Sequence, residues 1–296
     1  MSALVAPPRE GELVVVVGPT ASGKTALAIE LAEAWGGEIV SADSVQIYRR
    51  FDAGSGKPSP EERARAAHHL IDAVAPLDAI DAARFAELAD AVIADVRARG
   101  RVPIVCGGTF LWVRAVLFGL AEGAPSSPEV RARHRAIAEA EGRAAIHERL
   151  RAVDPASAAR LSPNDLLRTS RALEVHELTG RTMSEVQAAH GFRAARMPFR
   201  LVGVRRESAE LDARIAARAR TMLARGFVDE VRALLADGLG EARAMGSVGY
   251  KQVRDFVEGR LAEGELEPAI VRATRVFVRR QRTWLRDAGV DWIAPP

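Results

Sequence analysis

The chain has 296 residues and a formal net charge of +3 at pH 7, and 48% of its residues are hydrophobic while 27% are charged. This is the balance of a soluble globular protein with a sizeable core, in one large domain or two smaller ones. No apolar run approaches the ~20 residues that span a bilayer, and no leader of the signal-peptide type precedes Gly11. The single cysteine, Cys106, excludes an intramolecular disulfide and a cysteine-rich zinc module. We therefore expect a cytoplasmic protein that does not bind membranes.

The first predicted strand and helix flank a glycine-rich loop. The apolar run 13–17 leads into Gly18-Pro19-Thr20-Ala21-Ser22-Gly23-Lys24-Thr25, and residues 26–32 are good helix formers. The segment matches G-x-x-x-x-G-K-[S/T] in the strand–loop–helix context that a phosphate cradle needs. Backbone N–H groups and the helix N-terminus would hold the phosphate, Lys24 would add a point charge, and the Thr25 hydroxyl could hold Mg²⁺. The loop alone does not reveal which phosphate compound it binds.

Strands and helices alternate after this loop. The predicted elements are a strand over 38–44, a loop over 51–60, an edge strand over 68–72, a helix over 81–99, a strand over 102–106 and a helix over 110–120. Such alternation predicts an α/β fold with a parallel sheet flanked by helices, whose ligands lie at the carboxyl ends of the strands. Asp43 and Thr109 each follow such an end, so we expect both at the same edge as the phosphate loop.

The pattern changes near residue 121. From there to residue 196 it predicts helices alone, one of them over 166–178 after the capping sequence Ser162-Pro163-Asn164-Asp165. A strand is then expected over 199–204, followed by helices over 211–224, 228–236 and 269–287. We therefore divide the chain into a first core part, 1–121, an all-helical insertion domain, 122–196, and a second core part, 197–296.

The last predicted helix is rich in arginine. One face carries Arg272, Arg275, Arg279, Arg282 and Arg286, and the opposite face carries Ile270, Ala273, Phe277 and Trp284. Such a charged stripe is more often a solvated face than a binding surface. Arg280 falls within the apolar face. Because an unpaired buried guanidinium is costly, we expect an acidic side chain or a ligand phosphate beside Arg280 and count it among the candidate phosphate-binding residues.

The residues alone leave the reaction open. A phosphate loop usually serves nucleoside triphosphates, so a small-molecule kinase or a nucleotide-dependent switch using ATP or GTP is the first hypothesis. The expected site is poor in metal-binding acids, however. It offers one carboxylate, Asp43, that could act as a base, and one hydroxyl, Thr109, that could donate a hydrogen bond.

The chain resembles the bacterial tRNA dimethylallyltransferases, also called tRNA isopentenyltransferases. The matching segments are GPTASGKT (18–25), EIVSADSVQIYR (38–49), GKP (56–58), HHLID (68–72), VPIVCGGTFLW (102–112), SPNDLLRTSRALEVHELTG (162–180), VGYKQ (248–252) and TRVFVRRQRTWLR (274–286). They cover nearly the whole chain in the expected order. The resemblance implies a P-loop-type core in which residues 18–25 bind the diphosphate of dimethylallyl diphosphate, with Mg²⁺. The acceptor would be N6 of the adenosine that follows the anticodon in tRNAs reading codons that begin with U.

The resemblance also implies roles for individual residues. Asp43 would be the general base, Thr109 would hydrogen-bond the bridging oxygen of the leaving group, and Arg218 would serve the diphosphate. The expected tRNA contacts are Asp43, Ser44, Val45, Gln46, Leu167, Arg168, Thr169, Ser170, Arg171, Gly246, Ser247, Val248, Gly249, Tyr250 and Lys251. Gln46 is suited to reading an adenine edge, and the insertion would clamp the anticodon stem-loop of a tRNA bound to a monomer.

A related hypothesis has a free adenine nucleotide as the acceptor, as in plant and plant-pathogen enzymes that prenylate such nucleotides. The helical insertion with its arginine-bearing helix favours a macromolecular acceptor instead. No role follows from the sequence for His68, His69 or Lys57.

Overall fold

The computed structural model describes residues 5–121 and 125–294. The chain forms two compact units, one joining the chain up to Leu117 to the chain from Arg196 onwards, and the other comprising Phe118–Ala195. The sequence-based division placed the insertion at 122–196. Among the described residues, no helix is both long enough and apolar enough to cross a membrane.

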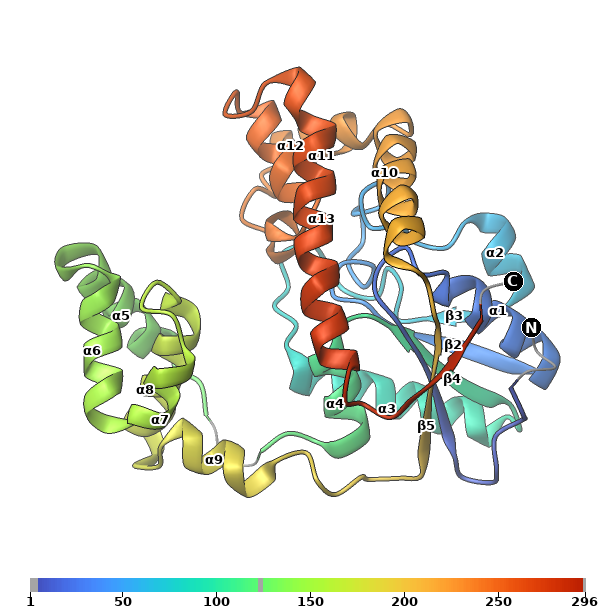
Figure 1. The fold of residues 1–296 in the computed structure, drawn as a ribbon, viewed down its shortest axis with the longest axis horizontal. Helices are drawn as coiled ribbons and strands as arrows, with labels where there is room; N and C mark the ends of the chain where they lie inside the picture. Colours follow the sequence, from blue (N-terminus) through green and yellow to red (C-terminus); the bar gives the residue numbers. More distant parts are fainter. Residues whose placement is uncertain (1–4, 122–124, 295–296) are drawn as a thin grey trace. The chain divides into compact units, whose positions relative to one another are not determined.

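The first unit contains a six-stranded parallel sheet flanked by helices (Figure 1), and the predicted fold class is confirmed. Its elements are β1 (Leu13–Val17), α1 (Lys24–Trp35), β2 (Gly37–Ala42), α2 (Pro60–Arg65), β3 (His68–His69), α3 (Ala82–Ala98), β4 (Val102–Gly107), α4 (Phe110–Phe118), β5 (Phe199–Val204), α10 (Ser208–Ala224), α11 (Phe227–Ala236), the 3₁₀ helix η2 (Arg243–Gly246), α12 (Tyr250–Val257), α13 (Glu263–Leu285) and β6 (Val290–Ile293). The strand order is β3-β2-β4-β1-β5-β6.

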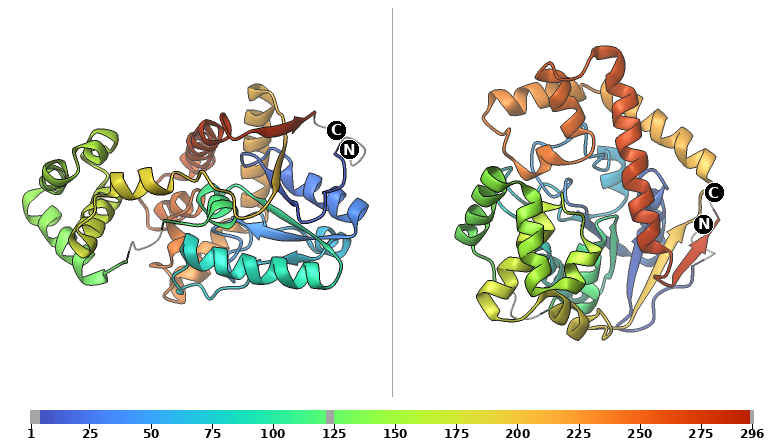
Figure 2. Two further views of the ribbon diagram at one scale, coloured as in Figure 1. Left: turned by 90° about the horizontal axis from the view of Figure 1, so that it is seen from below. Right: turned by 60° about the vertical axis from the view of Figure 1, so that its left-hand side comes forward.

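Strand β1 is buried along its whole length because helices cover both faces of the sheet. Side chains alternate between the faces, so Val14 and Val16 pack on the side of α1, against Leu27 and Leu31. Helix α3 covers the opposite face (Figure 2). The unbroken apolar run that predicted this strand is therefore the expected pattern for a central strand of such a sheet.

Three strands end at the same level, and this places the candidate site. Strand β4 lies between β1 and β2, with Gly107 paired to both Val17 and Ala42. The segments that follow these strands therefore leave the sheet side by side. They begin at Gly18, Asp43 and Gly108, so the phosphate loop, the candidate base and the candidate hydroxyl share one edge.

Helix α13 differs from its prediction in length and in orientation. It begins at Glu263, before the predicted start, and accommodates Pro268 in its second turn, where only one backbone hydrogen bond is lost. Its buried side chains are Leu266, Ile270, Val271, Val278, Gln281 and Leu285. Phe277, which was expected in the core, is 38% exposed. The face of α13 that packs in the core is thus rotated about the helix axis from the predicted face. Branched aliphatic side chains, and not Phe277, occupy most of it.

The second unit is a small helical domain. Its helices are α5 (Pro128–Glu141), α6 (Arg143–Val153), α7 (Pro155–Arg160), α8 (Leu166–Thr179) and α9 (Met183–His190). Ile146, Leu150 and Leu173 are central to its core. The carboxylate of Glu174, fully buried on α8, accepts two hydrogen bonds of 2.9 Å from Arg131 on α5. This charge-assisted pair ties the two helices together.

Candidate active site

The phosphate loop has the backbone geometry of an anion cradle. Gly23 is the N-cap of α1 with φ 100°, a conformation that side-chain-bearing residues rarely adopt, and Ala21 lies in the left-handed region at φ 64°. Helix α1 begins at Lys24, so the backbone N–H groups of its first turn have no partner inside the helix. These N–H groups and the helix dipole favour an anion at the loop.

Charged side chains surround this cradle. Burial lowers the pKa of Lys24, and the nearby Arg218 guanidinium lowers it further, while the Asp43 carboxylate acts in the opposite direction. Burial likewise lowers the pKa of Arg218, which Asp43 opposes. Two cations that repel each other beside a phosphate-type loop would be stabilised by an anion bound between them.

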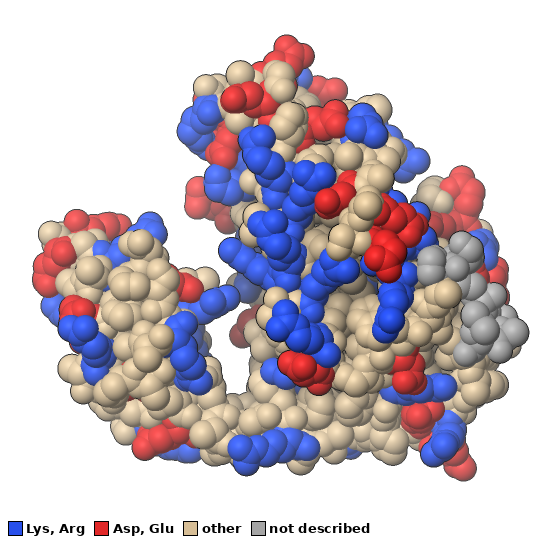
Figure 3. Space-filling view, viewed as in Figure 1, with Lys and Arg blue, Asp and Glu red and all other residues tan. Residues whose placement is uncertain are grey.

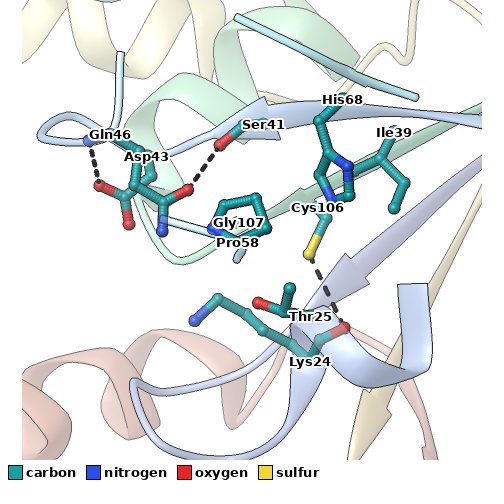
Figure 4. Close-up of a pocket in the computed structure, with 10 residues that line it drawn as sticks. All are labelled: Lys24, Thr25, Ile39, Ser41, Asp43, Gln46, Pro58, His68, Cys106 and Gly107. Carbon is teal, nitrogen blue, oxygen red and sulfur yellow. Dashed lines mark hydrogen bonds between the residues drawn. The ribbon is translucent and has the colours of Figure 1, made fainter. Parts of the chain in front are cut away.

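The loop and the end of β2 face each other across a pocket (Figure 4). Lys24 and Thr25 lie on one side, with Asp43 and Gln46 on the opposite side. The remaining lining residues are Ile39, Ser41, Pro58, His68, Cys106 and Gly107. The structure therefore brings the candidate base close to the lysine and the hydroxyl that begin α1.

The Asp43 carboxylate is held by one oxygen. Its Oδ1 accepts hydrogen bonds from the backbone N–H groups of Val45, at 2.9 Å, and Gln46, at 3.2 Å. Within residues 5–121 and 125–294, the other oxygen, Oδ2, has no hydrogen-bond donor. One oxygen thus orients the group and the other is available to accept a proton.

Thr109 is connected to the turn that carries Asp43 by hydrogen bonds to Ser44, the next residue along the chain. Its Oγ1 accepts the backbone N–H of Ser44 at 3.1 Å and lies 3.4 Å from the Ser44 hydroxyl, to which it can donate. The donated hydrogen bond is long and therefore weak. The Thr109 hydroxyl can exchange it for a stronger acceptor without losing the bond that orients the side chain.

Arg218 reaches the segment after β2 from helix α10. Its Nη2 lies 3.5 Å from the carbonyl oxygen of Ser55, and a Cβ added at Gly56 would fall 1.8 Å from the same nitrogen. Gly56 therefore has to be a glycine for the guanidinium to occupy this place.

Two further arginines contact the phosphate loop and escaped the sequence analysis. Arg206 Nε donates to the Ser22 carbonyl at 3.0 Å, and Arg214 Nε donates to the Ala21 carbonyl at 2.8 Å. The sequence position of each arginine could have indicated this contact. Arg206 follows β5, the neighbour of β1, and Arg214 lies one turn before Arg218 on α10.

Arg280 does not lie where the helical pattern placed it. It is exposed, and across the described part of the chain it has neither an ion pair nor a hydrogen bond. The expectation that Arg280 is buried is therefore wrong, and its role as a diphosphate ligand stays a prediction. The buried polar residue of this helix is its neighbour, Gln281.

Lys57 has a structural role, because its hydrogen bonds and ion pairs join separate parts of the chain. Its side chain is 6% exposed, and its Nζ donates to the Tyr48 carbonyl at 2.8 Å and to the carboxylates of Asp52 and Asp72 at 2.6 Å and 2.5 Å. It fixes the segment that follows Asp43.

The two adjacent histidines make separate hydrogen bonds. His68 Nδ1 pairs with the Ala66 carbonyl and His69 Nε2 with Glu38, each at 2.7 Å. Throughout the residues that the structure describes, no three His, Cys, Asp or Glu side chains are grouped to hold a metal.

Several residues expected to contact tRNA are engaged within the first unit. The Gln46 amide accepts from the Ser41 hydroxyl at 3.1 Å and donates to the Gly56 carbonyl at 2.9 Å. Tyr250 is fully buried, and its hydroxyl donates to Glu230 at 2.6 Å. The Tyr250 side chain is thus part of the core, whereas Gly246, Val248 and Lys251 are exposed in the same segment.

In the second unit, the start of α8 presents an apolar and a basic side chain to solvent. Leu167 is 78% exposed and its neighbour Arg168 is also exposed. Thr169 and Ser170 are buried. The Arg171 guanidinium binds the buried Glu174 and the Pro125 carbonyl.

Comparisons with known proteins identify the family. A family model described as IPP transferase matches residues 46–288. The chain belongs to this IPP transferase family. It is 69% identical over 292 residues to the tRNA dimethylallyltransferase of Sorangium cellulosum, covering 99% of this chain and 93% of the relative. It is 54% identical over 288 residues to that of Anaeromyxobacter dehalogenans strain 2CP-C, covering 96% and 95%.

Solved structures of IPP transferase relatives have the same fold. The full-length tRNA isopentenylpyrophosphate transferase of Bacillus halodurans superposes with a TM-score of 0.70 at 34% identity, covering 96% of this chain and 90% of that one. A eukaryotic dimethylallyltransferase acting on tRNA gives a TM-score of 0.75 at 24% identity, covering 96% and 73%, and shows likeness of fold alone. The family model begins after the phosphate loop, but the curated relatives match nearly the whole chain.

Proposed function

We propose that this member of the IPP transferase family transfers the dimethylallyl group of dimethylallyl diphosphate to N6 of the adenosine 3′-adjacent to the anticodon. The substrates would be tRNAs that read codons beginning with U, and the products N6-isopentenyladenosine in tRNA and diphosphate. The names of relatives at 69% and 54% identity support this reaction. The observation that carries it is the free Asp43 oxygen across the pocket from the phosphate loop, with Thr109 joined to the same turn.

The loop is suited to hold a diphosphate that departs. Residues 18–25 would bind it through backbone N–H groups, and Lys24 and Arg218 would balance its charge. When the bond between carbon and the bridging oxygen breaks, the electron pair goes to that oxygen. The Thr109 hydroxyl would leave its weak bond to Ser44 and donate to it. Donors placed where charge develops stabilise the transition state more than the ground state.

Asp43 would activate the acceptor. The N6 amine of adenine is a weak nucleophile because its lone pair is delocalised into the ring. As the new carbon–nitrogen bond forms, the amine loses a proton, and Oδ2 of Asp43 would accept it. The bonds from Val45 and Gln46 to Oδ1 keep the free oxygen in place during this transfer.

The pocket also fits Mg²⁺ bound with the substrate. Thr25 lines it opposite Asp43, and no cluster of three metal-binding side chains exists in the described residues to form a complete protein cage. Mg²⁺ commonly takes one or two protein oxygens and completes its shell with phosphate oxygens and water. The Thr25 hydroxyl would hold it, and the ion would neutralise part of the diphosphate charge.

The exposed basic surface suits an RNA acceptor. Lys and Arg side chains gather along α13 in the view of Figure 3, and Arg272, Arg279, Arg280 and Arg286 on this helix are exposed. On the second unit, Arg168 could contact a phosphate, and Leu167 could pack on an unstacked base. We propose that both surfaces bind the anticodon stem-loop and that the chain acts as a monomer.

The experiment incubates the purified chain with Mg²⁺ and labelled dimethylallyl diphosphate. Separate reactions contain unmodified tRNA, adenosine monophosphate, or ATP and GTP. We expect label in tRNA alone and no nucleotide hydrolysis. Transfer to adenosine monophosphate would favour a free-nucleotide acceptor, and hydrolysis without transfer would favour a kinase or a switch.

A further inference from the structure

A buried glutamine on α13 joins two parts of the site. Gln281 is 4% exposed. Its Oε1 accepts the backbone N–H of Thr20 at 3.0 Å, and its Nε2 donates to the carbonyl oxygen of Gly108 at 3.1 Å. Thr20 belongs to the phosphate loop after β1, and Gly108 directly precedes Thr109 after β4. A single side chain thus bonds to both loops.

The fit around this amide is close. A Cβ added at Gly108 would lie 2.6 Å from Nε2 and 3.4 Å from the Gly18 carbonyl oxygen, so the two loops and the amide leave no room for a side chain there. Both ends of the amide are satisfied, as buried polar groups require. An apolar side chain of equal length would fill the space but could make neither bond.

These contacts have different consequences for the two loops. The Thr20 N–H donates to Gln281, so it is not available to a bound phosphate, which would be held by other N–H groups of residues 18–25. The Gly108 carbonyl belongs to the peptide that leads into Thr109, so holding it restricts the direction of the Thr109 side chain. The Thr109 hydroxyl can act only if it points at the bridging oxygen of a diphosphate held in the loop.

We propose that Gln281 is a positioning residue that sets the spacing between the phosphate loop and Thr109. This inference rests on the proposed function, because it concerns a hydroxyl that acts on the leaving group. Gln281 bonds to protein atoms and acts through Thr109. Its effect should therefore fall on the chemical step and leave substrate binding nearly unchanged.

The test compares wild type, Gln281→Met, Thr109→Val and the double variant in single-turnover transfer of label to tRNA. Methionine keeps the length and volume of glutamine without its polar atoms. We expect Gln281→Met to lower the rate of the chemical step by about 10- to 100-fold, the loss typical of small misplacements, with KM for both substrates nearly unchanged. Because the two residues act in one unit, the double variant should be no more than about 3-fold slower than Thr109→Val.

Two controls keep the test decisive. Thr221→Val changes an exposed residue of α10, whose hydroxyl bonds only to the Ala217 carbonyl within the described residues, and should behave as wild type. If Gln281→Met does not fold, Gly108→Ala displaces the amide from the other side and should show the same non-additivity with Thr109→Val. Multiplicative losses, or a raised KM at an unchanged rate, would overturn the proposal.

Hydrogen exchange separates this inference from the proposed function. In Gln281→Met, backbone amides of residues 18–23 and 107–110 should lose protection together, whether or not the chain transfers a prenyl group. Unchanged protection in both segments would overturn the spacing role even if wild type is active. Absence of transfer by wild type would instead contradict the proposed function, with the exchange result still deciding the spacing role.

Discussion

Thr109 Oγ1 accepts the backbone N–H of Ser44 at 3.1 Å, which fastens the segment after β4 to the turn that carries Asp43. The candidate leaving-group donor and the candidate base are therefore held by one turn. This contact depends on the neighbouring positions of β2 and β4 in the sheet.

Replacing Asp43 by Asn should remove the base and preserve the turn. The Asn Oδ1 can still accept from the N–H groups of Val45 and Gln46, so the local structure should remain. We expect a loss of about 10²- to 10⁴-fold in the single-turnover rate, the usual contribution of a general base. The tRNA dissociation constant serves as the control and should change little. A variant that transfers label at the wild-type rate would remove Asp43 from the chemistry.

The chemical step should require the Thr109 hydroxyl and tolerate loss of the Thr109 methyl group. Thr109→Val has nearly the same shape but cannot donate, and we expect about a 10- to 100-fold slower chemical step. Thr109→Ser keeps the donor and should retain most of the rate. The two variants are compared in one single-turnover assay with saturating substrates. Equal losses in both would show that packing of the methyl group matters more than the hydrogen bond.

Lys57→Met should destabilise the first unit. It removes the cation between Asp52 and Asp72, of which Asp72 is partly buried. We expect the free energy of unfolding in urea at pH 7 to fall by roughly 1–3 kcal/mol, less than for a fully buried pair because both acids reach solvent. Arg232→Met, at an exposed ion pair on α11, is the matched control and should change little. An unchanged unfolding midpoint for Lys57→Met would contradict a stabilising role of these Lys57 contacts.

Glu38 should make the stability depend on pH under acid conditions. Hydrogen bonds from Arg99 and then from His69 outweigh burial and lower the pKa of this carboxyl from 4.5 to about 2. The unfolded chain binds a proton near pH 4.5 and the folded chain does so only near pH 2. The stabilisation is therefore complete above pH 4.5 and is lost as the pH falls towards 2, by at most roughly 3 kcal/mol.

The measurement is urea unfolding of wild type and Glu38→Gln between pH 5.5 and 3. The difference in unfolding free energy between the two proteins should shrink as the pH falls. A constant difference over this range would show that the Glu38 pKa is not lowered by folding.

The start of α8 should contribute to RNA affinity. Arg168→Ala removes an exposed guanidinium, and we expect weaker tRNA binding with a salt dependence reduced by about 0.7–0.9 in the slope of log K against log salt, the value of one phosphate contact. Arg149→Ala, at another exposed ion pair of the second unit, is the matched control. An unaltered slope for Arg168→Ala would argue against a phosphate contact there.

The residues at the carboxyl ends of the central strands could be predicted from sequence, because the sequence patterns that indicate these strands are local. Continuous apolar runs gave β1 and β4 their positions, and parallel pairing then required Asp43 and Thr109 to meet near the loop. The short strand β6 escaped prediction because Val290–Ile293 has only four residues and includes an aspartate. Helix α2 was not predicted, because Pro60 was assigned to the loop over 51–60 and the residues after it to no element, although Ser59 and Glu62 form a capping box.

The central contacts of the site could not be predicted because they join distant segments. Gln281 bonds to Thr20 across 261 positions of sequence, and a helical pattern shows only that one face is apolar. Including Trp284 and Phe277 rotated the predicted face about the helix axis away from the true one. Trp284 instead stacks on Phe110 at the border of the core, with ring centroids 4.9 Å apart, so the buried polar residue is Gln281 and not Arg280.

The most direct test of the account is to map the modified nucleoside. Unmodified tRNA is incubated with dimethylallyl diphosphate, Mg²⁺ and either wild type or Asp43→Asn, then digested and analysed by mass spectrometry. We predict N6-isopentenyladenosine at the position 3′ to the anticodon with wild type, and at least a 100-fold slower appearance with Asp43→Asn. Modification at another nucleoside, or none with wild type under conditions in which tRNA binds, would contradict the account.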